Sequence, residues 1–393
     1  MKVSFLLAAT ASLTLVSAAH AALPGTAAEL TEARSLIVGV TPTASGTQTA
    51  LGLGGGDPLY LPVRPLHNGV VGILMDYGIF TSGPNTGQPA RFVCSGALIP
   101  GGHVLTAAHC VRNRTGVTQA TPTVTTYFYG GNEDIRYYSH PDVTQVAVSN
   151  IFINPEYSGF VIDQADTAIL RLAAPAPDFA NVYQLSPRVD LTGLTFNVVG
   201  LGTRSFAGGN GGTSAGNGAA TGWIRQGFNR YDFRYGDDQF GGFFLQDSWF
   251  GQRANFAWLA DFDNGLVAQD ASCAIGGAFG LGGSQFCNLG LGPLEVNVAG
   301  GDSGGPQFIF GNQISTVTSF GQRYSNPLTD VNGVLDSSFG EFAGYAPVAI
   351  YRDWIRSIVP NAFVPEPGTW AMLIAGFGLV GAMARRRREA LAA

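Results

Sequence analysis

The chain has 393 residues, of which 46% are hydrophobic and 55 are glycine, and its 21 basic and 27 acidic residues give a net charge of −6. This apolar content supports one large or two small globular domains and argues against a disordered chain. Its only lysine is Lys2, which excludes a phosphate-binding P-loop, and no cysteine–histidine group has zinc spacing. No metal and no cofactor are therefore expected.

The first 21 residues have the layout of a secretory signal peptide. Lys2 supplies the positive start, an apolar stretch follows, and Ala19-His20-Ala21 forms the cleavage site. A short core helix is the alternative interpretation. Residues 22–66 are rich in Thr, Ala and Gly and predict an N-terminal arm or a propeptide. Export through the Sec machinery would permit disulfides.

From residue 67 onward, short β-branched and aromatic runs recur between Gly, Pro, Asn and Asp turns. Examples are "FVCSGALI", "HVLTAAHC" and "TFNVVGLGT". This rhythm predicts an all-β sandwich or barrel. A glycine-rich and then aromatic stretch at about 204–260 predicts an insertion. Near the end, "APVAIYRDWIRSIV" has helical spacing, with one apolar face made of Val348, Tyr351, Trp354, Ile355 and Val359.

Residues 360–393 form a linker and a targeting element. The Val364–Pro367 run is followed by an apolar stretch from Trp370 to Ala384 and by the tail Arg385–Arg388. This arrangement resembles the PEP-CTERM sorting segment of Gram-negative bacteria, which implies transient membrane insertion and an exosortase-type processing enzyme as a partner. A plain tail anchor is the alternative. Without the signal and the tail from Pro365, 16 basic and 25 acidic residues remain, a balance that disfavours a nucleic-acid partner.

Three polar residues carry the candidate chemistry. Ser303 lies in the glycine-rich run "GGDSGGP", where backbone N–H groups are accessible to an anion. His109 follows an apolar run in "TAAHC" and is a candidate base for activating a serine hydroxyl. Asp166 begins the apolar run "DTAIL" and could orient that base, since a buried carboxylate needs a donor. Asp163 is a weaker candidate for the same role.

Taken in this order, "TAAHC", "DTAIL" and "GDSGGP" resemble the chymotrypsin-like (trypsin family) serine peptidases over about residues 68–359. The resemblance implies an all-β fold of two antiparallel six-stranded β-barrels with a C-terminal helix, occupying residues 67–359. It also implies that His109 is the general base, that Asp166 orients it, and that Ser303 attacks the substrate. The oxyanion hole would be formed by the backbone N–H groups of Gly301 and Ser303.

The resemblance also implies two disulfides and a substrate-binding region. The four cysteines allow three pairings, of which the family pattern favours Cys94–Cys110 and Cys273–Cys287. "TSFG" at Thr318–Gly321 matches the family's substrate-pairing segment, which makes Ser319, Phe320 and Gly321 substrate-binding candidates, with Phe320 in the pocket wall. Asn297 stands at the base of the expected specificity pocket, where an aspartate would favour Arg or Lys. An uncharged P1 side chain is therefore expected.

Two further features leave alternatives open. "IVGV" at Ile37–Val40 resembles the terminus that in many relatives inserts beside the aspartate before the nucleophile, here Asp302, and Arg34 offers a processing point. "DFDNG" at Asp261–Gly265 resembles a calcium loop, but no glutamate follows at the twelfth position, so a tight turn is predicted instead.

The sequence thus predicts an exported bacterial serine endopeptidase that acts through a Ser-His-Asp acyl-enzyme mechanism on a protein or peptide substrate. Its location would be the periplasm, the cell surface or the medium. The alternatives are a surface binding or adhesion protein on the same scaffold, and an esterase.

Overall fold

The computed structural model describes residues 31–32, 38–39, 58–213, 217–246, 252–324 and 329–365. The predicted signal peptide, most of the N-terminal arm, and the apolar run and arginine tail of the predicted sorting segment lie outside these residues. In the part of the chain that is described, no helix combines the length and the apolar character needed to cross a membrane.

The first half of the described chain forms a closed barrel of six antiparallel strands in the order β3-β4-β5-β8-β7-β6. Its interior is built from apolar side chains that alternate along the strands, as Val71, Ile73 and Met75 do along β3. The predicted first barrel is confirmed. The strands are β3 (Val70–Ile79), β4 (Pro89–Ile99), β5 (His103–Thr106), β6 (Thr123–Phe128), β7 (Thr144–Ile153) and β8 (Ala168–Leu172).

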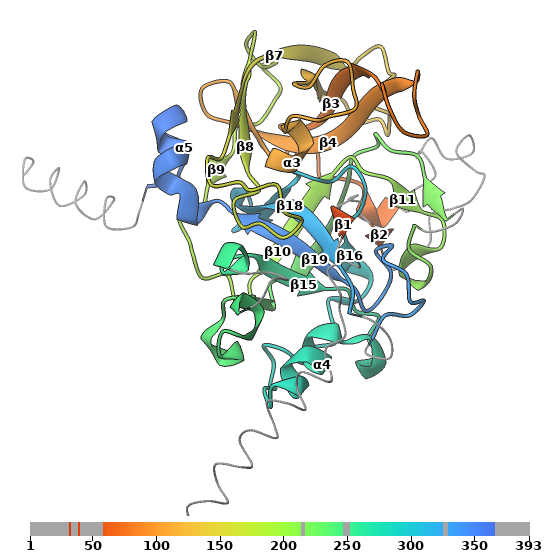
Figure 1. The fold of residues 1–393 in the computed structure, drawn as a ribbon, viewed down its shortest axis with the longest axis vertical. Coiled ribbons are helices and arrows are strands. Elements are labelled where there is room, and N and C mark those ends of the chain that lie inside the picture. Colours follow the sequence, from red (N-terminus) through yellow and green to blue (C-terminus); the bar gives the residue numbers. More distant parts are fainter. Residues whose placement is uncertain are drawn as a thin grey trace, which may run out of the picture.

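The second half is built on a larger sheet whose main path runs β13-β10-β17-β18-β19-β15-β14. Below the first barrel in Figure 1, this green-to-blue sheet forms a separate layer. The strands of the path are β10 (Thr195–Gly200), β13 (Arg225–Arg230), β14 (Phe233–Arg234), β15 (Trp258–Asp261), β17 (Pro306–Ile309), β18 (Gln313–Gln322) and β19 (Phe342–Pro347).

The two ends of this path, β13 and β14, are separated in sequence only by Tyr231 and Asp232. At this break the Asp232 N–H donates to the Leu259 carbonyl (2.9 Å), and the Asp232 carboxylate accepts from the Asp261 N–H (3.0 Å). A side chain therefore takes the place of a regular strand-to-strand bond. The two-barrel class is confirmed, with the difference that the second barrel is an open sheet whose closing strand is broken at Asp232.

Short strands and helices complete the described fold. The strands are β1 (Thr31–Glu32), β2 (Val38–Gly39), β9 (Gln184–Leu185), β11 (Arg204–Ser205), β12 (Gly218–Ala219) and β16 (Val296–Asn297). The α-helices are α3 (Ala108–Val111), α4 (Ala271–Ala278) and α5 (Arg352–Ile358). Single 3-10 turns are η2 (Pro58–Tyr60), η3 (Gly208–Asn210), η4 (Asp238–Phe240), η5 (Phe243–Leu245), η6 (Gln252–Ala254), η7 (Val267–Gln269), η8 (Gly292–Leu294) and η9 (Ala349–Tyr351).

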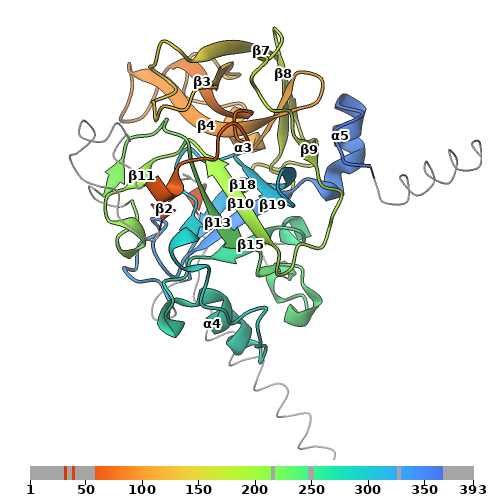
Figure 2. The same cartoon turned by 180° about the vertical axis from the view of Figure 1, so that it is seen from behind.

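The predicted terminal helix is confirmed as η9 followed by α5, which lies at the side of the molecule in both views (Figures 1 and 2). Of its predicted apolar face, Val348, Ile355 and Val359 are fully buried in a core cluster that also includes residues of both halves, such as Leu105 and Val317. This packing joins the end of the chain to the junction of the two halves.

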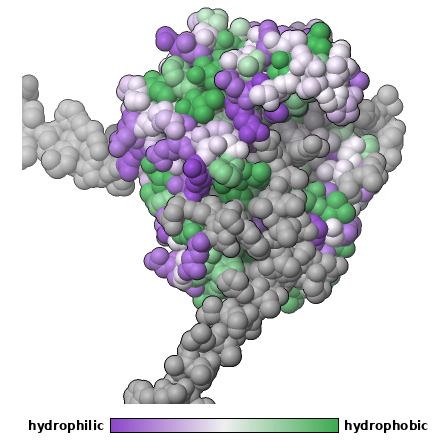
Figure 3. Space-filling view, in the orientation of Figure 1, coloured by the Kyte–Doolittle hydropathy of each residue, from purple (hydrophilic) through white to green (hydrophobic). Residues whose placement is uncertain are grey.

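Aromatic side chains of the predicted insertion also enter the core. Phe233, Phe240 and Phe244 pack in one cluster with Phe286 and Phe320, and their rings meet at centroid distances of about 5 to 6 Å. On the outer face shown in Figure 3, hydrophilic and hydrophobic residues are interspersed over the described part of the surface. The described part of residues 204–260 also supplies β13, β14 and most of β15, so this segment forms part of the second sheet rather than a separate addition to it.

Candidate active site

His109 and Asp166 both belong to the first barrel, close to the ends of paired strands. His109 lies in the short helix α3 directly after β5, and Asp166 precedes β8 by two residues. Because β5 and β8 are neighbours in the barrel, the two side chains meet. The Asp166 carboxylate accepts a hydrogen bond from the His109 backbone N–H (2.8 Å) and lies 2.7 Å from the ring Nδ1. Two contacts therefore fix the imidazole against one carboxylate.

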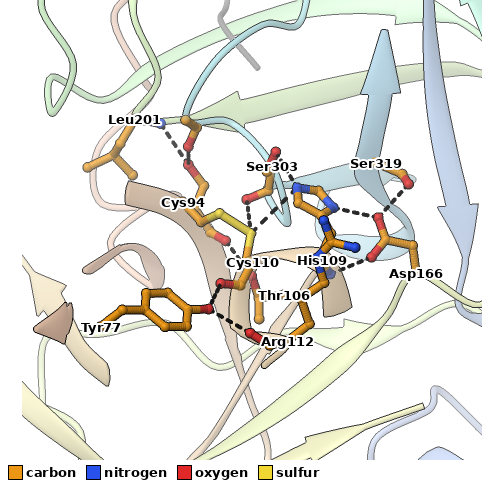
Figure 4. Close-up of a disulfide and its surroundings, with 12 residues drawn as sticks. Tyr77, Cys94, Thr106, His109, Cys110, Arg112, Asp166, Leu201, Ser303 and Ser319 are labelled. Atoms are coloured by element: carbon orange, nitrogen blue, oxygen red, sulfur yellow. Dashed lines mark hydrogen bonds and ion pairs between the residues drawn. A yellow bond between two sulfur atoms is a disulfide. The ribbon is translucent and has the colours of Figure 1, made fainter. Parts of the chain in front are cut away.

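Ser303 reaches the same histidine from the second half of the chain. Its Oγ lies 2.8 Å from the other ring nitrogen of His109, Nε2 (Figure 4). With Nδ1 donating to the Asp166 carboxylate, Nε2 of a neutral imidazole is the acceptor for the Ser303 hydroxyl proton. Ser303 is 2% exposed and His109 8% exposed, so the contact is shielded from bulk water. This is the geometry that a serine needs to become a nucleophile.

Ser319 adds a third donor to Asp166. Its hydroxyl donates to the carboxylate at 2.6 Å from strand β18. Burial raises the pKa of Asp166, but the charge of His109 and the hydrogen bonds from His109 and Ser319 outweigh it and hold the pKa below its usual range. Asp166 therefore stays ionised and can stabilise a positive imidazole. The sequence prediction placed Ser319 in substrate binding and did not include this contact.

The turn around Ser303 requires glycine at two positions. Gly301 has φ +115° and Gly304 has φ +77°, both in the region that other residues rarely adopt. A Cβ atom added at Gly304 would lie 2.0 Å from the Thr106 Oγ1 and 2.6 Å from the Ala107 backbone nitrogen. The glycines of the motif thus let the nucleophile loop approach the strand that leads to His109.

Ser95 on β4 of the first barrel fixes this loop across the junction. Its backbone N–H donates to the Ser303 carbonyl (2.9 Å), and its hydroxyl donates to the Gly301 carbonyl (2.8 Å) and accepts from the Leu201 N–H (3.0 Å). No sequence motif predicted this role of Ser95, because it depends on a loop that lies 206 residues further along the chain.

Both predicted disulfides are present in the structure. Cys94 is bridged to Cys110 and Cys273 to Cys287. The first bridge, shown in Figure 4, joins the neighbour of Ser95 to the neighbour of His109. The second joins helix α4 to the chain that leads toward β16. No free cysteine occurs in the described chain.

The predicted substrate-binding residues lie in two strands. Phe320 and Gly321 follow Ser319 in β18, and Phe320 is fully buried in the aromatic cluster that contains Phe233. Asn297 is buried in β16, where its side-chain oxygen accepts from the Val298 N–H (2.8 Å). The described structure therefore holds Asn297 and Phe320 inside the fold near the nucleophile loop.

Two segments before residue 58 pair with these same strands. Strand β1 pairs antiparallel with β18, with Thr31 opposite Gly321 and Glu32 opposite Phe320. Strand β2 pairs antiparallel with β16, with Val38 opposite Asn297. Residues 31–32 and 38–39 thus pair with the strands that hold the predicted substrate-binding residues.

Asp302, directly before the nucleophile, is fully buried. Its carboxylate accepts from the Gly202 N–H at 2.9 Å and from the Ala299 N–H at 3.5 Å. Burial raises the pKa of Asp302 well above its usual range, and the hydrogen bond from Gly202 offsets only part of this effect. The weaker candidate Asp163 caps its own turn instead, since it accepts from Ser158 and Ala165.

Comparison with known proteins agrees with this geometry. A family model described as Trypsin matches residues 80–218, and a second model, described as a PEP-CTERM protein-sorting motif, matches residues 363–388. The chain is also similar to an ovochymase from Halocynthia roretzi, with 34% identity over 82 residues, which is 21% of this chain and 5% of that relative.

The chain therefore has a trypsin-like segment at residues 80–218 and a match to a PEP-CTERM sorting motif at residues 363–388. The matched range contains His109 and Asp166 but ends before Ser303. The assignment of Ser303 rests on its motif and on its contact with His109. This arrangement can transfer a proton from a serine hydroxyl to an imidazole held by a carboxylate.

Proposed function

We propose that the protein is an exported serine endopeptidase in which Ser303, His109 and Asp166 act as a catalytic triad. The observation that supports it best is the continuous chain of contacts from the Ser303 Oγ through both His109 nitrogens to Asp166 and Ser319. Every member is at least nine-tenths buried. A binding protein would have no need for this alignment.

In the proposed reaction, the Ser303 Oγ attacks the carbonyl carbon of the scissile peptide bond as its proton passes to His109 Nε2. The backbone N–H groups of Gly301 and Ser303 stabilise the oxyanion of the tetrahedral intermediate, each worth about 3 kcal/mol in such sites. His109 then protonates the leaving amine, and the C–N bond breaks to give an acyl-enzyme on Ser303. A water molecule, deprotonated by His109, hydrolyses this ester and regenerates the hydroxyl.

Labelling with a fluorophosphonate tests this proposal, because the reagent modifies only an activated serine. We expect rapid labelling of Ser303 in the parent protein, its loss in His109→Ala, and its retention in the control His103→Ala, whose histidine lies outside the triad. Absence of labelling in a folded parent would favour the binding protein. Hydrolysis of ester substrates without hydrolysis of matched peptides would favour an esterase.

We further propose an uncharged P1 preference, because Asn297 supplies no negative charge at the expected base of the pocket. A peptide library scanned for the residue before the cleaved bond tests this preference. Cleavage after uncharged residues is expected. Cleavage concentrated after Arg or Lys would contradict the assignment of Asn297.

We also propose that the N-terminal arm, residues 22–66, contains a propeptide that covers the substrate-binding strand. The proposal is supported by the pairing of Thr31 and Glu32 with Gly321 and Phe320, since a segment in that position competes with a substrate strand. Removal of residues 22–36 should lower the KM for a peptide substrate by tenfold or more. An unchanged KM in a folded truncated protein would reject it.

The sorting tail supports a proposed route to the periplasm, the cell surface or the medium, with the Sec machinery and an exosortase-type enzyme as partners. An epitope placed after Ala393 should be absent from the mature protein, whereas one placed after the exposed Gly87 should be retained. Retention of both epitopes in the exported protein would instead indicate a plain tail anchor.

A further inference from the structure

A group of buried carboxylates lies at the end of strand β15, in the chain segment between β15 and β16. Asp261 and Asp263 flank Phe262, and side chains two residues apart in an extended chain point to the same side. Phe262 points away from them and packs on Phe339, with ring centroids 4.7 Å apart. Asp270 joins the two aspartates from the start of helix α4. All three carboxylates are only 2% exposed.

The three carboxylates converge on one point. One oxygen from each can be chosen so that all three lie within 4.8 Å of one another. Oxygen ligands of a single Ca²⁺, each about 2.3 to 2.6 Å from the ion, are separated by no more than about 5 Å. The spacing therefore matches that of oxygens around one cation.

Asp263 provides an independent sign that a ligand belongs here. Neither of its carboxylate oxygens has a hydrogen-bond partner, although the side chain is buried. Asp261 and Asp270 each accept one backbone N–H, from Ser272 and Cys273, both at 2.7 Å. A buried carboxylate with no donor is rare in a native protein, because nothing replaces its lost hydration.

Two more buried acids increase the negative charge. Glu295 accepts from the Asp263 N–H at 2.6 Å, and Asp232 accepts from the Asp261 N–H at 3.0 Å. Among the described residues, the only cation in an ion pair with any of these five acids is Arg230, 3.8 Å from Asp232. Without a further positive charge, burial and then the charges of Asp261 and Glu295 raise the pKa of Asp263 to about 10.

We propose that Asp261, Asp263 and Asp270 bind a calcium ion, with Glu295 and Asp232 supplying second-layer charge and hydrogen bonds. Carboxylate oxygens are the ligands that Ca²⁺ prefers, and the group contains no thiol or imidazole that would favour a softer metal. The proposed site differs from the sequence interpretation of "DFDNG" as a tight turn, since its third ligand comes from α4 rather than from the twelfth position of a loop.

The bound ion would join three parts of the second half of the molecule. Asp261 ends β15, Asp270 begins α4, and Glu295 lies two residues before Asn297 in β16. The ion would therefore stabilise the chain that enters the predicted specificity pocket. This consequence concerns stability first and does not depend on the proposed peptidase activity.

Calcium binding is best measured on the Ser303→Ala protein, which removes any self-digestion and keeps this test separate from the test of catalysis. After treatment with EDTA and dialysis, titration with CaCl₂ should release or absorb heat with one site per chain. A hundredfold excess over the Kd should raise the unfolding midpoint by about 5 °C or more. Asp263→Asn should abolish the heat and the shift, whereas the exposed Asp238→Asn should keep both.

Asp263→Asn also has an expected signature in EDTA. Its unfolding midpoint should be no lower than that of its parent, because the amide is already neutral, whereas the Asp263 carboxyl must take up a proton to be buried without a cation. This result shows that the variant folds. The proposal is overturned if the parent shows neither binding heat nor a shift, or if Asp263→Asn retains both. An equal response to MgCl₂ at the same concentration would overturn the assignment to calcium.

Discussion

Asp166 in the active site and Asp263 in the acidic cluster are equally withdrawn from solvent, with exposures of 1% and 2%. Asp166 accepts hydrogen bonds from the His109 backbone, the His109 ring and Ser319, whereas Asp263 accepts none in the described structure. The pKa of Asp166 is lowered, and that of Asp263 is raised to about 10. Burial alone therefore does not decide the charge of a carboxylate; the donors or cations around it do.

The largest expected effect is on catalysis at the well-partnered carboxylate. Asp166→Asn should lower kcat by about 10⁴-fold, because the amide no longer stabilises a positive imidazole or selects its tautomer. Steady-state hydrolysis of a peptide substrate measures it. The exposed Asp178→Asn is the control and should retain full activity. A loss of less than tenfold in Asp166→Asn would mean that Asp166 is not the orienting group.

His67 is a buried basic side chain that can be compared with the two buried carboxylates. His67 is 1% exposed, its Nε2 contacts the Gln226 Oε1 at 3.0 Å, and its Nδ1 has no partner. Burial, against the hydrogen bond to Gln226, lowers the pKa of His67 from 6.5 to about 4. Between these two values the unfolded chain binds a proton that the folded chain does not.

The stability contributed by neutral His67 is thus fully present above about pH 6.5 and is lost as the pH falls toward 4. The loss amounts to about 3 kcal/mol. The free energies of unfolding of the parent and of His67→Gln can be measured with urea at pH 7.5 and at pH 4. Over this range the parent should lose about 3 kcal/mol more than the variant. A difference that is constant with pH would contradict it.

The two buried carboxylates, Asp166 and Asp263, can each be replaced with the neutral amide, and the free energy of unfolding measured in EDTA at pH 7. Asp166→Asn should lower the free energy of unfolding by about 1 to 3 kcal/mol, because it disturbs a satisfied hydrogen-bond network. Asp263→Asn should raise it by about 1 kcal/mol, because the parent must protonate this carboxyl in order to bury it, whereas the amide is already neutral. Two effects of the same sign would show that the surroundings of the two groups do not differ in the way described.

The smallest expected effect follows from the loss of one donor to Asp166. Ser319→Ala should lower kcat/KM by about tenfold, the equivalent of one hydrogen bond to a charged group.

The same substitution should change how stability depends on acid. The depressed pKa of Asp166 stabilises the fold above the pKa of this group in the unfolded chain, which is near 4, and this contribution is lost as the pH falls below that value. In Ser319→Ala the folded pKa of Asp166 is less depressed, so this acid loss should be smaller and should end at a higher pH. An unchanged acid transition would show that the hydroxyl does not contribute to the lowered pKa.

The sequence sufficed for the parts of the site that lie within short motifs. His109, Asp166 and Ser303 each stand beside small or apolar residues that restrict where the chain can run, and the structure brings the three together. The strand rhythm predicted the first barrel, and the helical spacing of Val348 and Ile355 predicted the terminal helix. In these cases the signal is local, with a period of two or of 3.6 residues.

What the sequence did not reveal depends on contacts between distant segments. Asp263 and Glu295 are 32 residues apart, and their burial follows from the packing of α4 and β15 rather than from any local pattern. Ser95 gains its role only when β4 meets the nucleophile loop. The break at Asp232 that leaves the second sheet open is also invisible, because an aspartate between two strand-like runs is indistinguishable from a turn residue.

The bridge between Cys94 and Cys110 has a consequence for the time at which this site is completed. One end adjoins Ser95, which holds the nucleophile loop, and the other adjoins His109. A single covalent bond thus links the segment that carries His109 to the strand that holds the Ser303 loop. This bond forms only in an oxidising compartment. Under the proposed export route, a newly made chain in the reducing cytoplasm lacks this bond, so the site would be completed only outside the cytoplasm.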